Sequence, residues 1–170
     1  GLALVPFKKE APLPPELDES RLISIVEERS EEALLDTTTL PTRTPCILVV
    51  DDDPLTRSFL KHHLETAGCL VLEAEDGIAA LEAVQHGPDL ILMDIRMPRM
   101  DGLDATRIIK TTPVGATLPV VIMSVIRDRS RLAFALQCGA TDFIPKPLDI
   151  TRTLATISDL LDHKGLRLSA

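Results

Sequence analysis

From residue 45 onward, short apolar runs alternate with longer amphipathic segments. This alternation predicts repeated βα units around a parallel sheet, that is, an α/β fold. The apolar runs predict five strands, at 46–50, 69–74, 90–93, 119–123 and 141–144. The first, third and fourth consist almost entirely of Ile, Leu, Val and Met, which is typical of central strands covered by helices on both faces. The second and fifth are less apolar, so we expect them nearer the edges.

The amphipathic segments predict five helices, at 53–68, 78–86, 103–110, 130–138 and 150–163. In the first of them, Asp53 is the expected N-cap, Pro54 occupies the first helical position, and Gly68 ends the helix. The apolar positions that we expect this helix to bury are Leu55, Phe59, Leu60, Leu64 and Ala67.

Residues 1–44 differ from the rest of the chain, because they are rich in proline and in acidic residues. They predict an N-terminal extension or interdomain linker with one helix near 16–35, which is either a solvated linker helix or a docking or dimerisation helix. Residues 45–163 then form the folded domain, and residues 164–170 a C-terminal tail. Because the chain begins with Gly1 rather than Met, we expect it to be a piece of something longer.

The composition excludes several classes of function. The chain has 170 residues, of which 45% are hydrophobic, enough for one core plus a spare segment. Aromatic residues make up only 2%, without Trp or Tyr, so base-stacking platforms and aromatic sugar-binding clefts are excluded. The net charge of −8, with no Lys/Arg run longer than Lys8-Lys9, argues against binding to a nucleic-acid backbone or an anionic membrane, and we expect no direct contact with nucleic acid.

The cysteines and the hydropathy pattern indicate a cellular compartment. Cys46, Cys69 and Cys138 form an odd set without C-x-x-C spacing, which favours reduced thiols over disulfides or a zinc site. Apolar runs are much shorter than the roughly 20 residues of a membrane span, and the first residues lack the pattern of a signal peptide. We therefore expect a cytoplasmic location and no membrane insertion in this segment.

Polar residues that can bind ions or take part in a reaction follow the predicted strands. The acidic run 51–53 follows the first strand, Asp94 the third, Ser124 the fourth and Lys146 the fifth. Ligands of an open parallel sheet bind at the carboxyl ends of the strands, so these side chains are expected to meet there. Two carboxylates about 4 Å apart repel by about 4 kcal/mol at an effective dielectric constant near 20. Mg²⁺ relieves such repulsion, since it prefers carboxylate and phosphate oxygens.

This set of residue types suits reversible phosphorylation. A carboxylate can attack phosphorus and form an aspartyl phosphate if a metal ion and a lysine neutralise the phosphoryl oxygens. Asp94 is the candidate nucleophile, Lys146 the candidate cation, and the Ser124 hydroxyl a hydrogen-bond donor to the phosphoryl group.

Four blocks of sequence resemble the receiver domain of two-component response regulators. They are 47–54 (ILVVDDDP), 92–102 (LMDIRMPRMDG), 120–124 (VVIMS) and 141–147 (TDFIPKP), and the resemblance covers about residues 45–163. The second block and its continuation to residue 110 are especially similar to receivers carried by hybrid histidine kinases. The resemblance implies a flavodoxin-like, doubly wound five-stranded parallel sheet in the order 2-1-3-4-5 with five helices.

The resemblance also implies a phosphoacceptor and a metal site. Asp94 matches the phosphoacceptor, and Asp51 and Asp52 match the acidic pair that binds Mg²⁺ with it. Asp52 is the expected direct ligand, while Asp51 acts partly through water. The backbone carbonyl of Arg96 completes the expected set of protein ligands.

Further matches imply a conformational switch. Ser124 and Phe143 match the switch pair, whose hydroxyl and aromatic ring move together and alter the face formed by the fourth helix, the fifth strand and the fifth helix. Lys146 matches the lysine of the family pattern, and its bond to Pro147 is expected to be cis. The resemblance thus implies a signalling domain rather than an enzyme.

Two positions bear on access to the acceptor. The family usually has a small residue after the switch hydroxyl, but this chain has Val125, from which we expect slower phosphorylation or slower hydrolysis. Arg96, two residues after Asp94, is expected either to orient the attacking water or to block it. Asp101 and Gly102 fall where a turn is needed, so turn chemistry explains them better than catalysis.

The implied partners are a histidine kinase or histidine phosphotransfer protein as phosphodonor, and a downstream protein on the face of the fourth and fifth helices. One alternative is a haloacid-dehalogenase-like phosphatase, since Asp51, Asp53, Ser124 and Lys146 loosely imitate the motifs of that family. It leaves the block around Asp94 unexplained. Another alternative is a receiver-like scaffold that is never phosphorylated.

Overall fold

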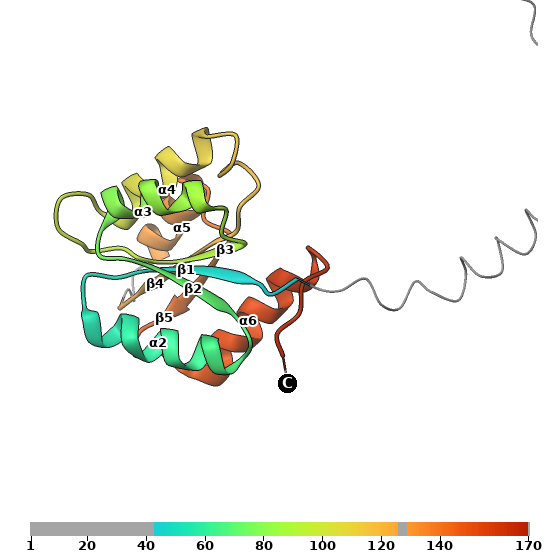
Figure 1. The fold of residues 1–170 in the computed structure, drawn as a ribbon. Helices are drawn as coiled ribbons and strands as arrows, with labels where there is room; N and C mark the ends of the chain where they lie inside the picture. Colours follow the sequence, from blue (N-terminus) through green and yellow to red (C-terminus); the bar gives the residue numbers. More distant parts are fainter. Residues whose placement is uncertain (1–42, 126–128, 170) are drawn as a thin grey trace, which may run out of the picture. The chain divides into compact units, whose positions relative to one another are not determined.

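The sheet decides how the rest of the domain is arranged. A computed structural model describes residues 43–125 and 129–169, which belong to the second of two units, Gly1–Pro41 and Thr42–Ala170, into which contacts divide the chain. Five parallel strands lie in the order β2-β1-β3-β4-β5 (Figure 1). They are β1 (Cys46–Val50), β2 (Leu70–Ala74), β3 (Leu90–Asp94), β4 (Val120–Ser124) and β5 (Asp142–Pro145). The predicted fold class and strand order are confirmed, whereas the helix expected near 16–35 lies outside the described residues.

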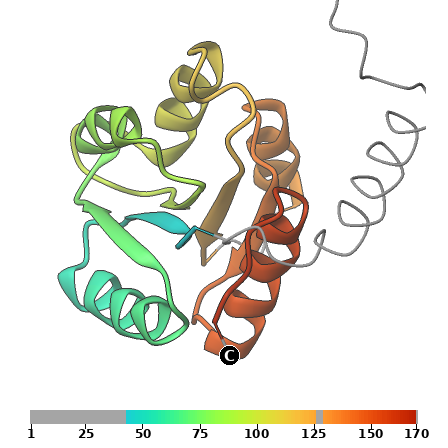
Figure 2. The same cartoon turned by 45° about the vertical axis from the view of Figure 1, so that its right-hand side comes forward.

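Helices cover both faces of this sheet, so the domain has three layers. They are α2 (Pro54–Thr66), α3 (Gly77–Ala83) with a 3-10 turn (Val84–His86), α4 (Gly102–Thr111), α5 (Arg129–Gln137) and α6 (Ile150–Asp162). Helices α3, α4 and α5 lie on one face, and α2 and α6 on the other (Figures 1 and 2). The five described helices are those predicted from sequence.

The central strands send alternate side chains into two hydrophobic clusters. In β1, Leu48 and Val50 join the cluster under α3, α4 and α5, while Ile47 and Val49 join the cluster under α2 and α6. All four side chains are fully buried. This two-sided burial is the physical reason why the central strands are apolar up to their last residues, Asp94 in β3 and Ser124 in β4.

Pairing between strands moves some boundaries by one residue relative to the prediction. Asp94 pairs with Met123, and Ser124 pairs with Pro145, so both site residues occupy the last positions of strands rather than the first positions of loops. At the other end, β2 begins at Leu70 instead of residue 69. Periodicity marks the apolar part of a strand, whereas the ladder of hydrogen bonds fixes its ends.

Helix α2 buries fewer apolar residues than predicted. Leu60 and Leu64 are fully buried against the sheet, but Leu55 and Phe59 are 78% and 41% exposed, so the expectation that they are buried is wrong. Ala67 is half-buried and caps the helix. The sheet covers only one side of the helix, and Leu55 and Phe59 lie on a side that lines a groove.

The residues expected to form a C-terminal tail pack against the domain. Leu166 is buried in the cluster under α2 and α6, and the backbone N–H of Ser169 donates to the carbonyl oxygen of Ala67 at 2.9 Å. Lys164 donates to the carbonyl oxygen of Asp89 at 3.0 Å. The side chain of Asp89 in turn pairs with Arg43, so residues near both ends of the described domain meet beside β3.

The three cysteines are free thiols, of which Cys69 and Cys138 are buried and Cys46 is half-buried. Burial raises the pKa of the Cys69 thiol to about 11, which makes this thiol a poor nucleophile. Across residues 43–125 and 129–169, each helix is either too short or too polar to cross a bilayer.

Candidate functional site

Three carboxylates meet at the carboxyl edge of the sheet. Asp51 follows β1 and Asp94 ends β3, and these two strands are neighbours. One carboxylate oxygen from each of Asp51, Asp52 and Asp94 lies within 4.8 Å of the others. Asp51 and Asp94 are only 1% and 7% exposed, whereas Asp52 is exposed. The sequence prediction that these residues meet is therefore met by the geometry.

A lysine that follows the edge strand β5 completes this cluster. Lys146 follows β5, and its Nζ lies 2.6 Å from Asp51 Oδ2 and 2.9 Å from Asp94 Oδ1. Its backbone N–H donates to the carbonyl oxygen of Ser124 at 2.9 Å, which fixes the lysine backbone beside the end of β4. The bond between Lys146 and Pro147 is cis.

Burial and charge shift the pKa values of the two groups that form this ion pair. Burial raises the pKa of Asp94; Lys146 opposes this change, and the charges of Asp51 and Asp52 add to it. For Lys146, burial lowers the pKa, but its hydrogen bonds to Asp51 and Asp94 outweigh burial and leave the value above its usual range. The lysine stays charged, and the three carboxylates still exceed it in charge. This donor set fits a hard divalent cation such as Mg²⁺.

The carboxylate of Asp51 is already engaged on both oxygens. Its Oδ1 accepts a hydrogen bond from the backbone N–H of Asp53 at 2.9 Å, and its Oδ2 binds Lys146. Asp52 projects from the same turn and is exposed. The two members of the acidic pair therefore differ, because Asp51 holds the site together while Asp52 faces solvent.

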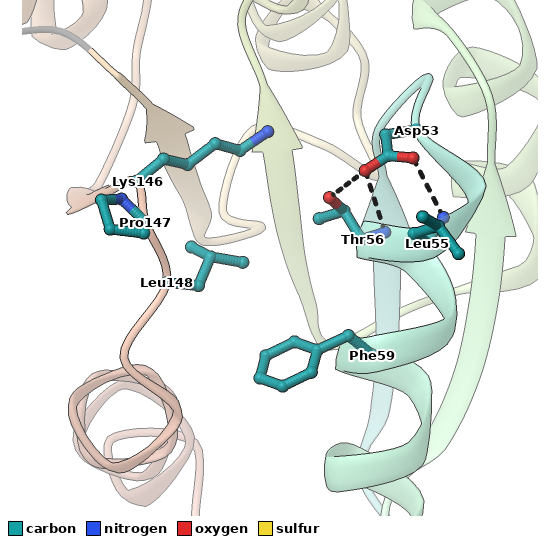
Figure 3. A pocket seen from close by; sticks show the side chains of 7 residues that line it. All are labelled: Asp53, Leu55, Thr56, Phe59, Lys146, Pro147 and Leu148. Atoms are coloured by element: carbon teal, nitrogen blue, oxygen red, sulfur yellow. Dashed lines mark hydrogen bonds between the residues drawn. The ribbon is translucent and has the colours of Figure 1, made fainter.

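Asp53 has the structural role that the sequence predicts. Its carboxylate accepts hydrogen bonds from the backbone N–H groups of Leu55 and Thr56 at 3.1 and 3.2 Å and from the Thr56 hydroxyl at 2.7 Å (Figure 3). These bonds, led by the one from the Thr56 hydroxyl, lower the pKa of Asp53. The residue is the N-cap of α2.

The remaining predicted site residues lie around this cluster. Ser124 is the last residue of β4 and is 5% exposed, next to the strand that ends with Asp94. Phe143 in β5 is half-buried and packs on the cluster under α3, α4 and α5. Val125 is 60% exposed, and Arg96 is exposed in the loop that follows Asp94.

Gly102 lets the start of α4 lie against Asp94, a contact that sequence reasoning missed. A Cβ atom at this position would lie 1.9 Å from the carbonyl oxygen of Asp94, so only glycine allows the start of α4 to approach so closely. Its N–H donates to the carbonyl oxygen of Ile95 at 2.7 Å. Asp101 before it is the N-cap of α4, with its carboxylate accepting from two backbone N–H groups. The sequence signal was Asp-Gly, which we interpreted only as a turn.

An apolar groove opens beside the acidic cluster. It has a volume of about 390 Å³ and lies between the first turns of α2 and the segment after β5 (Figure 3). The residues that line it are Asp53, Leu55, Thr56, Phe59, Lys146, Pro147 and Leu148. Because Lys146 belongs both to the groove and to the cluster, a molecule seated in the groove lies next to the acidic site.

Comparison with solved structures supports both the fold and the family. The receiver domain of a signal transduction histidine kinase from Syntrophus aciditrophicus is 34% identical, with 71% of this chain and 92% of that chain covered and a TM-score of 0.66. The receiver domain of the sensor histidine kinase PA1611 from Pseudomonas aeruginosa is 28% identical, with 70% and 98% covered and a TM-score of 0.66. That structure holds a magnesium ion coordinated in its active-site cleft.

Curated relatives agree with this result. Response regulator MprA from Mycobacterium leprae is 39% identical over 116 residues, which cover 68% of this chain and 50% of the relative. The DNA-binding transcriptional regulator NtrC from Proteus hauseri is 43% identical over 120 residues, which cover 69% of this chain and 24% of the relative. The chain thus spans about half the length of MprA and about a quarter of the length of NtrC. Residues 47–158 match the family model described as the response regulator receiver domain, and the chain belongs to this family of two-component signalling domains.

Proposed function

We propose that the domain accepts a phosphoryl group on Asp94 from a phosphohistidine of a partner protein and thereby switches its contacts with a downstream protein. The observation that carries this proposal is the ion pair of Lys146 with both Asp51 and Asp94 at the exposed edge of the sheet. A buried carboxylate nucleophile next to a fixed ammonium group is the arrangement that phosphoryl transfer to a carboxylate requires.

The transfer step follows from these contacts. A carboxylate oxygen of Asp94 attacks the phosphorus atom, the P–N bond to the donor imidazole breaks, and the bond electrons leave with the imidazole. Lys146 shifts from Asp94 onto a phosphoryl oxygen and keeps its bond to Asp51, since the same Nζ contacts both carboxylates. The hydroxyl of Ser124 then donates a hydrogen bond to another phosphoryl oxygen.

The proposed cofactor is Mg²⁺, held by Asp52, by Asp94 and by the backbone carbonyl of Arg96. Asp51 contributes through water, because both of its carboxylate oxygens already bind protein groups. When bound, the ion neutralises charge on the phosphoryl oxygens. The magnesium ion in the receiver of the Pseudomonas aeruginosa kinase supports this choice of metal.

The apolar groove is the proposed docking place of the phosphodonor, a histidine kinase or a histidine phosphotransfer protein. Leu55 and Phe59 expose apolar surface at the entrance to the acidic cluster, and Lys146 joins the two. A helix that buries these two side chains would bring its histidine toward Asp94. The proposed location of this exchange is the cytoplasm.

The proposed switch runs through Ser124 and Phe143 to the face formed by α5, β5 and α6, where a downstream protein binds. Ser124 ends β4 and Phe143 lies in the neighbouring strand β5, so a shift of the hydroxyl toward the phosphoryl group is transmitted across one strand pair. In this proposal residues 45–163 form the receiver, and residues 1–44 are an N-terminal extension or an interdomain linker of a longer protein.

The decisive experiment is intact mass spectrometry after incubation with Mg²⁺ and acetyl phosphate. We expect one phosphoryl group, labile to hydroxylamine, on the native chain and none on Asp94→Asn. An adduct of equal yield on Asp94→Asn would refute Asp94 as the acceptor. Failure of the native chain to form an adduct while it binds Mg²⁺ would favour the unphosphorylated scaffold.

Val125 is the proposed control on access to Asp94. Its side chain is 60% exposed after the switch hydroxyl, so it stands at the entrance rather than in the core. We expect Val125→Ala to speed up either phosphorylation or hydrolysis of the phosphoryl group, with Arg96→Ala as a comparison at the other side of the site. If both rates are unchanged in Val125→Ala, this access role is wrong.

A further inference from the structure

Arg57, a residue of α2, contacts the turn that carries Asp51 and Asp52. Arg57 Nη1 donates to the backbone carbonyl oxygen of Asp51 at 2.8 Å, and Arg57 Nε lies 3.6 Å from Glu73 Oε1 on β2. The Arg57 side chain is only 18% exposed. A guanidinium group can serve two acceptors at once because its donors are held in a planar fork. Arg57 thus connects the edge strand to the turn that carries the acidic pair.

The carbonyl oxygen held by Arg57 belongs to the peptide unit between Asp51 and Asp52. This unit is planar, so a bond to its oxygen restricts rotation on both sides, about ψ of Asp51 and φ of Asp52. Other bonds hold Asp51 itself, since its N–H donates to Ala74 and its carboxylate binds Asp53 N–H and Lys146. Arg57 acts one step further on, at the peptide unit that sets the direction of Asp52.

We propose that Arg57 is a positioning residue for metal binding. By fixing the peptide unit between Asp51 and Asp52, it keeps the exposed Asp52 carboxylate within reach of Asp51 and Asp94, and Glu73 orients the guanidinium group. This inference rests on the magnesium site of the proposed function. Arg57 does not touch the ion or the phosphoryl group, so its effect passes through the backbone.

Charge alone predicts the opposite effect. A guanidinium group near a Mg²⁺ site repels the ion, so removal of its charge would strengthen binding if Arg57 acted only through electrostatics. If it positions Asp52, removal weakens binding, because the turn then has more conformations to lose when the ion binds. The sign of the change in Mg²⁺ affinity therefore separates positioning from electrostatics.

Lys61 provides a matched control. It lies one turn further along α2 and binds the same carboxylate of Glu73, with Nζ 2.9 Å from Oε2. Replacement of Lys61 by Met removes one positive charge and one link between α2 and β2, as Arg57→Met does. It leaves the bond to the carbonyl of Asp51 in place.

The experiment is calorimetric titration of the full chain with Mg²⁺, alongside thermal unfolding of each variant. We expect Arg57→Met to raise the Kd for Mg²⁺ about tenfold, the usual size of an effect from a residue that orients a metal ligand. Lys61→Met should leave the Kd within about twofold. Arg57→Lys should recover only part of the affinity, because Arg57 reaches its two acceptors with two separate nitrogens, Nη1 and Nε, whereas lysine has only one. With acetyl phosphate, saturating Mg²⁺ should restore most of the phosphorylation rate of Arg57→Met.

The outcomes distinguish this inference from the proposed function. If the native chain does not bind Mg²⁺, the proposed metal site itself fails. If the native chain binds Mg²⁺ and Arg57→Met binds it equally well or more tightly, or if Lys61→Met weakens binding as much, only the positioning role is overturned. Should Arg57→Met fail to fold, Glu73→Gln tests the same chain of contacts, and an unchanged Kd in that variant also overturns the role.

Discussion

The buried charge of Asp94 should make the native domain less stable than a variant without it. We consider Asp94→Asn, which keeps the size of the side chain and one oxygen that can accept from Lys146. At an effective dielectric constant near 20, the attraction between Asp94 and Lys146 at 2.9 Å amounts to about 6 kcal/mol. Repulsion from each carboxylate within 4.8 Å amounts to about 3.5 kcal/mol or more at the same dielectric constant, less for the exposed Asp52.

These charge interactions nearly cancel, so the cost of burying the charged Asp94 decides the sign. The raised pKa of Asp94, caused first by burial, agrees with a net cost. We expect Asp94→Asn to raise the free energy of unfolding at pH 7.5 by about 1–2 kcal/mol without Mg²⁺. For a chain of this size, the melting temperature should rise by about 3–6 °C.

The sign of the pH dependence follows from linkage. Because the pKa of Asp94 is raised in the folded state, the folded protein binds this proton more tightly than the unfolded chain does. The resulting stability is fully present below the ordinary value of 3.8 and is lost as pH rises through the raised value. The advantage of Asp94→Asn should therefore be largest at neutral pH and should shrink toward pH 4.

Unfolding should be followed by circular dichroism, because the chain has no Trp or Tyr to report by fluorescence. The buffer should contain a chelator, so that the measurement is made without Mg²⁺. Asp104→Asn on α4 is the control, since that carboxylate is 57% exposed and its replacement should change stability by less than about 0.5 kcal/mol. Saturating Mg²⁺ should remove the advantage of Asp94→Asn, because only the native site gains from the ion. The reasoning is refuted if Asp94→Asn is no more stable than the native chain at pH 7.5, or if the difference does not shrink in acid.

Substitutions at three further positions test a close approach, a helix cap and a buried carboxylate of the domain by urea unfolding. Gly102→Ala should cost more than about 2 kcal/mol, because its Cβ would collide with the carbonyl of Asp94; equal stability would contradict the close approach. Asp101→Ala should cost about 1 kcal/mol through the lost N-cap of α4, whereas Asp101→Asn should retain most of the stability. Asp89→Ala should cost about 1–3 kcal/mol, because the buried carboxylate accepts from the backbone N–H of Cys46; unchanged hydrogen exchange at that amide would contradict this.

Local sequence patterns were sufficient for the elements of the domain and for the identity of its chemical groups. The central strands are predictable because both faces of such a strand are buried, so that nearly all of its residues are apolar. The groups at the edge are predictable because, in a parallel sheet, residues that follow strands gather at one edge. For this reason Asp51, Asp94 and Lys146 could be named from sequence alone.

Only the tertiary structure decided which apolar side chains of α2 are buried. Periodicity identifies apolar positions, but it does not say which of them another element will cover. Leu60 and Leu64 face the sheet, while Leu55 and Phe59 remain exposed beside Lys146 and form the groove. The same apolar pattern thus serves both the core and a surface that we assign to a partner.

The contacts that tune the site were also decided by the tertiary structure. Lys146 and Asp51 are 95 residues apart, and their 2.6 Å contact exists only because β5 and β1 belong to the same sheet, with β3 and β4 between them. Arg57 binds a backbone oxygen, and backbone oxygens are the same at every residue, so no sequence pattern marks the acceptor. The sequence by itself determined which groups are available and at which edge they gather. Only the packed fold determined which atoms they touch, because those contacts depend on distances between elements that are remote along the chain.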